Sequence, residues 1–275
     1  MNDVKYGTIE FECQGPIGVL TLNRPERLNA INGQMKREIA DVLPRIEADE
    51  AIRVLILRGA GRAFCSGFDL QAEAEEEPAG VEYWRPELRR DFDAIMSFWY
   101  FPKPTISSIH TYALAGGFEL AVACDITIAA EGTRVGEPEL KFGSGIVALL
   151  LPWLTSPKKA KEIILTGNDR LDAREAEALG LINRVVPAGE EFKTAMAVAR
   201  DIAVMDPDGV RLMKEAINRS YEIMGMGEAL RMALDIDVEI ESLQTPDRVT
   251  FREISRAEGL KAAIAWRDAR FSKNR

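Results

Sequence analysis

Short apolar runs rich in β-branched residues alternate with amphipathic helical patterns along this 275-residue chain, and this alternation most limits the folds open to it. Runs typical of buried strands stand at Ile17–Leu22, 54–57, Thr105–Ile109 and 126–129. Apolar residues recur at three- and four-residue spacing over residues 34–47, which predicts an amphipathic helix. Strands that alternate with helices in this order predict an α/β fold class.

The strand patterns stop after about Gly189, and helical patterns follow, with Pro207 and Pro246 at breaks between them. We therefore divide the chain into an α/β core over residues 1–190 and an all-helical region over residues 191–275. The predicted helices of this second region cover residues 192–205, 210–224, 228–243 and 251–270.

Composition excludes several classes of function. Lys and Arg total 35 against 44 Asp and Glu, a net charge of −9, whereas a nucleic-acid-binding domain is usually basic. A single histidine, His110, cannot build a His-rich metal site, and the three cysteines form no CxxC pair, which predicts reduced thiols and a cytoplasmic protein. No signal-peptide pattern and no membrane-length apolar run is present, so no membrane partner is expected. Acid–base chemistry must then rely mainly on carboxylates.

Residues 71–90 are crowded with glutamates and poor in apolar residues, which predicts a mobile loop. Two interpretations stay open. The loop is either a solvated insertion or a lid, because it leaves directly from a glycine-rich turn. Tyr83 and Trp84 within it either contact a substrate or pack in the ordinary way.

Two glycine-rich turns each follow a predicted strand. The first turn spans residues 58–70, and the second spans residues 110–120 and enters a helix near Gly117. Backbone N–H groups from two such turns can converge on one oxygen, which is the geometry that an oxyanion hole requires. The spacing of the glycines fits neither the GxGxxG pattern nor the P-loop.

Two glutamates near these turns are candidates for acid–base chemistry. Glu119 lies in the first turn of a predicted helix, where it is either a partner of the helix dipole or a catalyst. Glu139 follows the predicted strand 126–129 and is either a surface residue or a catalyst. Two carboxylates that face one water act as an acid–base pair when one is ionised and the other protonated.

Other nucleophile and base candidates are disfavoured. Ser66, between Cys65 and Gly67, does not fit the GxSxG nucleophile elbow, so a serine hydrolase is not expected. We expect His110 to be a packed histidine rather than a catalyst, and Cys65 to be buried rather than reactive.

Taken in order, the motifs resemble those of the enoyl-CoA hydratase/isomerase (crotonase) superfamily. The resemblance runs from about residue 17 to 190 and extends weakly to residues 258–260. The matching segments are Asn23-Arg24-Pro25, Leu28-Asn29-Ala30, residues 63–70, residues 112–119, Glu137-Pro138-Glu139, residues 173–176 and residues 180–187.

The resemblance implies a core built as a spiral of ββα turns, followed by a helical C-terminal region that forms trimers. The expected assembly is a homotrimer or a dimer of trimers. The expected ligand is an acyl-CoA thioester, with no metal and no cofactor other than the coenzyme A of the substrate. The expected reaction is hydration of the double bond of a 2-enoyl-CoA.

The same resemblance assigns residues by position. The backbone N–H groups of Phe68 and Gly116 would form the oxyanion hole, and Glu119 and Glu139 would be catalytic. The residues expected to bind CoA and substrate are Arg24, Arg27, Leu28, Ala63, Gly67, Asp69 and Leu70, and those of the acyl pocket are Tyr83, Trp84, Phe142 and Ile146.

The sequence departs from the family pattern in its pocket and tail. Residues 142–151 turn apolar early where family hydratases commonly carry a glycine- and proline-rich stretch, so a different acyl pocket is expected. At Ala263 and Trp266, relatives often carry Phe and Lys that touch CoA from a neighbouring helix. Three alternatives to a hydratase stay open: an enoyl-CoA isomerase, an acyl-CoA hydrolase, and a non-catalytic relative that binds CoA thioesters.

Overall fold

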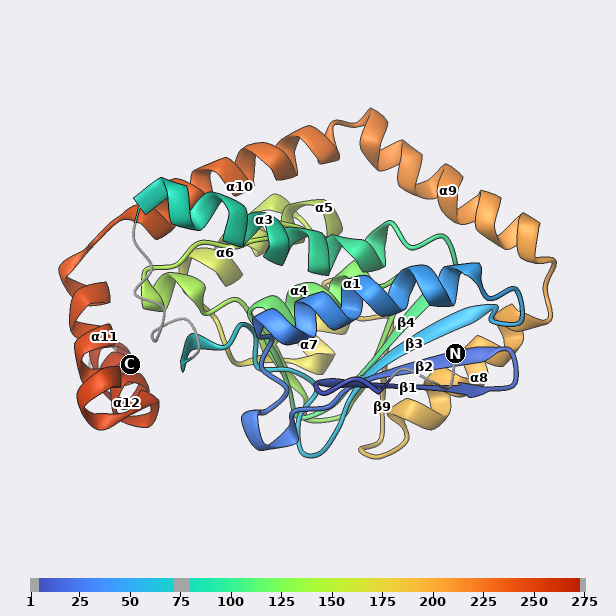
Figure 1. Ribbon diagram of the computed structural model, residues 1–275, viewed down its shortest axis with the longest axis horizontal. Coiled ribbons are helices and arrows are strands. Elements are labelled where there is room, and N and C mark those ends of the chain that lie inside the picture. Colours follow the sequence, from blue (N-terminus) through green and yellow to red (C-terminus); the bar gives the residue numbers. More distant parts are fainter. Residues whose placement is uncertain (1–4, 72–79, 273–275) are drawn as a thin grey trace.

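The computed structural model describes residues 5–71 and 80–272, which form two sheets and the helices around them (Figure 1). In the main sheet β1 and β2 are antiparallel, and the remaining neighbours are parallel. Its strands, in spatial order, are β1 (Ile9–Gln14), β2 (Ile17–Leu22), β3 (Val54–Gly59), β4 (Thr105–Ile109), β6 (Ile126–Ala130) and β9 (Arg184–Val186). A smaller sheet contains β5 (Tyr112–Leu114), β7 (Arg134–Gly136) and β8 (Leu171–Asp172). The four strands predicted from apolar runs are all present.

The central strands β2, β3, β4 and β6 of the main sheet are buried on both faces, which explains the runs from which they were predicted. Ile17 and Val19 belong to a cluster with residues of α8 (Glu191–Ala203). Leu20 and Leu22, which point to the opposite face, belong to the larger core. That core also takes in residues of α1 (Gly33–Ala48), α3 (Gly80–Trp99) and α4 (Gly116–Ala123).

The remaining helices connect the strands or follow the last one. Short helices within the first region are η1 (Pro25–Arg27), η2 (Glu139–Phe142), α5 (Leu151–Leu154), α6 (Pro157–Leu165) and α7 (Ala173–Ala178). The C-terminal helices are α9 (Pro207–Ile223), α10 (Met226–Ser242), α11 (Pro246–Glu258) and α12 (Leu260–Ser272). In Figure 1, α9 and α10 run along the top of the molecule, and α11 and α12 lie at its left end.

The predicted α/β class with a helical C-terminal region is confirmed. The division at residue 190 stays a prediction, and α8, which begins just beyond it, packs against the main sheet. Among the helices of residues 5–71 and 80–272, none combines the length and the apolar character needed to cross a bilayer.

The loop prediction for residues 71–90 is wrong for its second half. Residues 80–90 belong to α3, where Trp84 and Leu88, four positions apart, are both buried against the core. The charged residues of this stretch lie on the other faces of the helix. Because they are numerous, the four-residue spacing of the buried apolar residues was not recognised as a helical pattern. Residues 72–79 lie outside the described residues, and the lid interpretation stays a prediction.

The single helix predicted over residues 251–270 is also wrong, because the structure has α11 and α12 there. Gly259 separates them with a φ of +90°, a conformation that an L side chain rarely adopts. Its N–H donates to the carbonyl of Ser255, which ends α11.

Asn29 ties the segment after β2 to the turn after β3. The residue is fully buried and lies in the left-handed region at φ 54°. Its Oδ1 accepts from the N–H of Arg24 at 2.9 Å, and its Nδ2 donates to the carbonyls of Ala60 (2.8 Å), Ala63 (2.8 Å) and Phe64 (3.1 Å). One side chain therefore satisfies several buried backbone groups and fixes the start of the first glycine-rich turn.

Replacing this amide should be costly. We expect Asn29→Ala to lower the free energy of unfolding by about 3 kcal/mol, since it leaves buried carbonyls without donors. Asn23→Ala, which removes only an exposed hydrogen bond to Glu10, should cost less than about 1 kcal/mol. Urea unfolding of the two variants measures the difference, and equal stabilities would contradict the role given to Asn29.

Candidate active site

The two glycine-rich turns, one after β3 and one after β4, lie in direct backbone contact. Leu114 donates its N–H to the carbonyl of Cys65 at 3.1 Å. Gly67 has φ +95°, and a Cβ on it would lie 2.6 Å from the Cβ of Ala115 and 3.4 Å from the nitrogen of Gly116. No side chain fits between the turns at this point, so glycine is required there.

Two backbone N–H groups at this contact have no protein partner. Ile31 exchanges hydrogen bonds with Gly67 and Asp69 on either side of Phe68, so the N–H of Phe68 faces away from that neighbour. Gly116 is the first residue of α4, where an N–H has no intrahelical acceptor. Within residues 5–71 and 80–272, neither N–H has a hydrogen-bond acceptor.

Strain marks the second turn. Ala115, which directly precedes Gly116, has φ 54° and ψ −138°, a conformation that costs a non-glycine residue about 1–3 kcal/mol. Its N–H donates to the carbonyl of Gly136 at 2.9 Å, which helps to hold the peptide in place.

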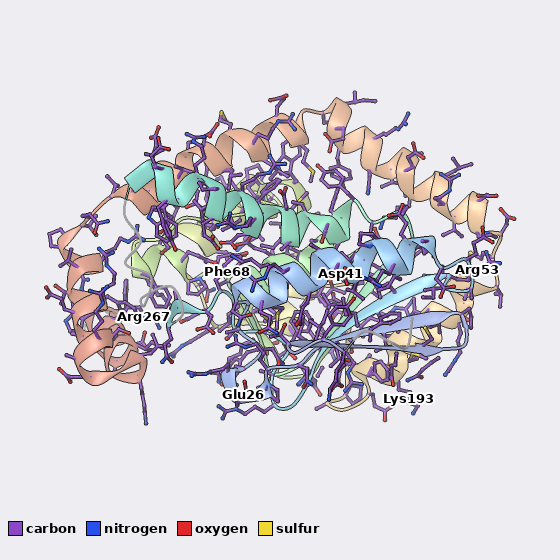
Figure 2. The ribbon with its side chains drawn as sticks, in the orientation of Figure 1. Glu26, Asp41, Arg53, Phe68, Lys193 and Arg267 are labelled. Atoms are coloured by element: carbon purple, nitrogen blue, oxygen red, sulfur yellow. The ribbon has the colours of Figure 1, made fainter. Side chains whose placement is uncertain are left out.

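A cavity of about 750 Å³ has both turns in its wall, and residues of α1, α3, η2, α10 and α12 complete it. Glu26, Phe68 and Arg267 line it and lie on the left of Figure 2, whereas Arg53 and Lys193, on the right, do not. Segments from the beginning, middle and end of the chain therefore meet around one space.

Most of the side chains predicted for the site are brought together here. Those that line the cavity are Arg27, Leu28, Phe68, Asp69, Leu70, Tyr83, Trp84, Glu119, Glu139 and Phe142. The others, Arg24, Ala63, Gly67, Gly116 and Ile146, are not part of its lining. Arg24 forms an ion pair with Asp69 at 2.8 Å, so it contacts the lining indirectly. The functional roles of all these residues stay predictions.

Glu119 and Glu139 lie close together in this cavity, and Glu137, which is not part of the lining, lies beside them. One carboxylate oxygen of each lies within 4.8 Å of the others. Oε2 of Glu119 accepts the N–H of Ala148 at 2.6 Å, whereas its Oε1 is buried without a partner. Both carboxyl groups of Glu139 and Glu137 are also buried, and among the described residues they form no well-aligned hydrogen bond, although they lie within reach of each other.

Burial makes all three glutamates weak acids. Loss of hydration raises the pKa of Glu139 to about 8. The same loss, and next the charge of Glu139, raises the pKa of Glu119 and of Glu137 well above its usual range. Because the three interact, they titrate as a set rather than one by one.

These glutamates are also the one group of three or more candidate ligands, within the described chain, that lies close enough to hold a cation. Carboxylate oxygens suit hard ions such as Mg²⁺ or Ca²⁺, but they bind only when deprotonated. Because their pKa values are raised, protons compete with any cation for these carboxyl groups. The expectation that the reaction uses no metal stays a prediction.

Glu137 was not predicted as a site residue, and it lies beside Glu119 and Glu139 without lining the cavity. It stands in the Glu137-Pro138-Glu139 motif, so its position was a usable signal. Several residues that do line the cavity were also not predicted. Arg62 lies within the first glycine-rich turn, which was a usable signal. No sequence signal marks the basic residues Lys36, Lys261 and Arg267 or the acidic residues Asp91, Asp237 and Glu241, because helical spacing does not show which part of a chain covers a cavity.

The structure also locates the three residues that the sequence disfavoured as catalysts. Ser66 lines the cavity. His110 does not line it, and His110 Nε2 lies 3.1 Å from the carbonyl oxygen of Gly61. Cys65 is buried as predicted, and burial raises the pKa of its thiol to about 12. A thiol with that pKa is a poor nucleophile at neutral pH.

The glutamate pKa values predict how stability depends on pH. A carboxyl whose pKa is raised on folding binds its proton more tightly in the folded chain, so stability is lost as pH rises between the two pKa values. For Glu139 this window runs from roughly pH 4.5 to about 8. We expect the melting temperature to fall by several degrees across it, and Glu139→Gln to reduce that fall. The exposed-site control Glu131→Gln should leave it unchanged, and a wild-type melting temperature that rises with pH would contradict the expectation.

Comparison with known proteins identifies the family. Residues 12–262 match the family described as enoyl-CoA hydratase/isomerase. The crystal structure of an enoyl-CoA hydratase/isomerase from Xanthobacter autotrophicus Py2 superposes with a TM-score of 0.95 at 52% sequence identity, over 97% of this chain and 99% of that one. This likeness confirms the predicted crotonase fold.

Two named proteins add to the comparison. A protein of Rhizobium meliloti named "Probable enoyl-CoA hydratase" is 34% identical over 98% of this chain and 99% of its own. One of Dictyostelium discoideum named "Probable enoyl-CoA hydratase, mitochondrial" is 36% identical over 80% of this chain and 78% of its own. The chain belongs to the enoyl-CoA hydratase/isomerase family and is a member of the crotonase superfamily.

Proposed function

We propose that the protein is a hydratase that adds water across the double bond of a 2-enoyl-CoA thioester. One observation carries this proposal: the two glycine-rich turns, whose Phe68 and Gly116 N–H groups have no acceptor among the described residues, meet beside a cavity that two buried carboxyl groups line. The first pair can bind a developing negative charge, and the second can transfer protons. Family membership and the names of the relatives support the same reaction.

In this proposal, the N–H groups of Phe68 and Gly116 bind the thioester oxygen. Polarising the carbonyl makes the β-carbon electrophilic, and addition of a nucleophile there moves charge onto the oxygen as an enolate. Two fixed donors stabilise that charge, and losing one such donor costs about 3 kcal/mol of barrier. The backbone contact at Gly67 holds both donors in place before substrate arrives.

Glu119 and Glu139 then hold one water between them. One carboxylate removes a proton from the water while the oxygen of that water bonds to the β-carbon. The other carboxyl group then donates its proton to the α-carbon as the enolate returns to the thioester. The bond from Ala148 fixes Glu119 and leaves its Oε1 available to the water. Such proton transfers contribute roughly 10²- to 10⁴-fold each.

Basic side chains supply partners for the phosphates of coenzyme A. Arg27 and Arg62 approach the cavity from the first region, and Lys261 and Arg267 approach it from α12 of the same chain. We infer that the substrate is held by α12 of its own subunit, and not by the Phe and Lys that the family resemblance leads one to expect at positions 263 and 266. No redox cofactor has a role in this chemistry.

We also infer that the chain works as a cytoplasmic homotrimer or dimer of trimers. The apolar side chains of Leu212, Met213 and Ile217 on α9, and of Met232 and Ile236 on α10, are exposed in the single chain. A subunit interface would remove this surface from water. The three cysteines are unpaired, as expected for a reducing compartment.

Conservative changes test the glutamate pair. We expect Glu119→Gln and Glu139→Gln each to lower kcat for hydration of crotonyl-CoA by roughly 10²- to 10⁴-fold, because an amide cannot exchange a proton in this way. The loss of enoyl-thioester absorbance measures the rate, and circular dichroism checks the fold. A chelator in the assay should leave the wild-type rate unchanged.

Glu131→Gln, at an exposed position outside the cavity, is the matched control. Full activity of Glu139→Gln would contradict the two-carboxylate mechanism. Analysis of the product separates the alternatives. A 3-hydroxyacyl-CoA product supports a hydratase, an enoyl-CoA with a shifted double bond indicates an isomerase, and a free carboxylic acid indicates a hydrolase. Tight thioester binding with no product would indicate a non-catalytic relative.

A further inference from the structure

Asp237 on α10 is a buried acid that nothing in the proposed mechanism uses. It is only 2% exposed and lines the same cavity as the glutamates. Among the described residues, neither of its carboxyl oxygens forms a well-aligned hydrogen bond, and the backbone donor within its reach, the N–H of Gly145, bonds to Glu241. Burying a polar group without a partner costs free energy, so an unpaired acid in a cavity wall indicates a place where a ligand completes the bonding.

The neighbouring acids differ because each has its own cation. Glu241, one helical turn further along α10, forms an ion pair with Arg248 and accepts the N–H of Gly145 at 3.3 Å. Asp91 forms an ion pair with Lys36. Of these three cavity acids, Asp237 is the one that has no ion pair with a described residue and no well-aligned hydrogen bond.

Asp237 lies near the reacting groups but among apolar walls. Its charge acts on both Glu119 and Glu139, so it stands within electrostatic reach of the proposed reaction centre. Aromatic and aliphatic side chains line the same cavity, from Tyr83, Trp84, Leu88, Phe142 and Val147. A hydrogen-bonding group in an otherwise apolar wall can favour a substrate whose acyl chain carries one polar substituent at the matching position.

An unpaired donor accompanies this acid. The indole Nε1 of Trp84 is buried without a hydrogen-bond partner, although Trp84 lines the cavity. Helix α3, which carries Trp84, packs along α10, which carries Asp237. Arg248, whose charge acts on Asp237, lies 5.8 Å from the Trp84 ring. An unused donor and an unused acid therefore belong to one side of the cavity.

We propose that this side of the cavity binds an acyl group that carries a hydroxyl beyond the double bond, with Asp237 as its hydrogen-bond partner. This inference rests on the proposed function, and it names the class of substrate. A hydroxyl can donate to Asp237 and can also accept a hydrogen bond, whereas a methyl group leaves the acid unpaired. An ammonium group can only donate, and it loses more hydration on burial.

Three matched series of straight-chain trans-enoyl-CoAs test the proposal. They end in a methyl, a hydroxyl or an amino group and vary in length. With the wild-type enzyme, we expect kcat/KM at one length to favour the hydroxyl over the methyl by at least about tenfold, since sites built to bond a hydroxyl reject analogues that lack it. Asp237→Leu, of similar size, should remove this preference or reverse it.

Asp235→Leu is the control, because Asp235 is exposed on the same helix and pairs with Arg85. Asp237→Asn keeps an acceptor and should retain most of the preference, which also guards against a folding defect in Asp237→Leu. Equal values for hydroxyl and methyl at every length, or a preference for the amino series, would overturn the proposal.

Failure of the proposed function would look different. If no thioester turns over, the methyl series included, the hydratase assignment is wrong. Calorimetry with the same thioesters then tests the proposed preference for a hydroxyl separately from the reaction. Tighter binding of a hydroxyl thioester than of the methyl thioester of the same length supports this preference, and equal binding rejects it.

Discussion

The contact between the two glycine-rich turns is the constraint on which the site depends. Gly67 and Ala115 approach so closely that a side chain on Gly67 would collide with the second turn. This contact, supported on one side by the hydrogen bonds of Asn29, fixes the turn that carries Phe68 against the turn that carries Gly116, next to the cavity. Donors fixed in this way need no reorganisation when charge develops on a substrate oxygen.

The second constraint is electrostatic, and it works against stability. Glu119, Glu137, Glu139 and Asp237 have buried carboxyl oxygens that form no well-aligned hydrogen bond among the described residues, an arrangement that a purely structural core would avoid. Glu137 and Glu139 lie on one short segment, and Asp237 comes from a helix nearly a hundred residues later in the chain. Such concentrations of unpaired acid are typical of active sites, where stability is lost in exchange for groups with shifted pKa values.

The sequence predicted those parts of the fold that depend on local pattern. Ile17–Leu22 and Val54–Gly59 are mostly buried, so their apolar runs marked these strands. β1 was missed because it is mostly exposed at the edge of the sheet and contains no apolar run. Residues 80–90 were misjudged because charge content outweighed the spacing of Trp84 and Leu88. The meeting of Glu119 with Glu139 came only from the family resemblance, and Asp237 had no signal at all, because its burial depends on how α10 packs against α3.

A crystal structure of the protein with a bound, non-reacting acyl-CoA thioester would test the central claim most directly. The account predicts the thioester oxygen at about 2.7–3.1 Å from the backbone nitrogens of both Phe68 and Gly116. It also predicts the α- and β-carbons beside the carboxyl groups of Glu119 and Glu139. A thioester carbonyl bound away from either nitrogen, with the acyl chain outside the cavity that these glutamates line, would contradict it.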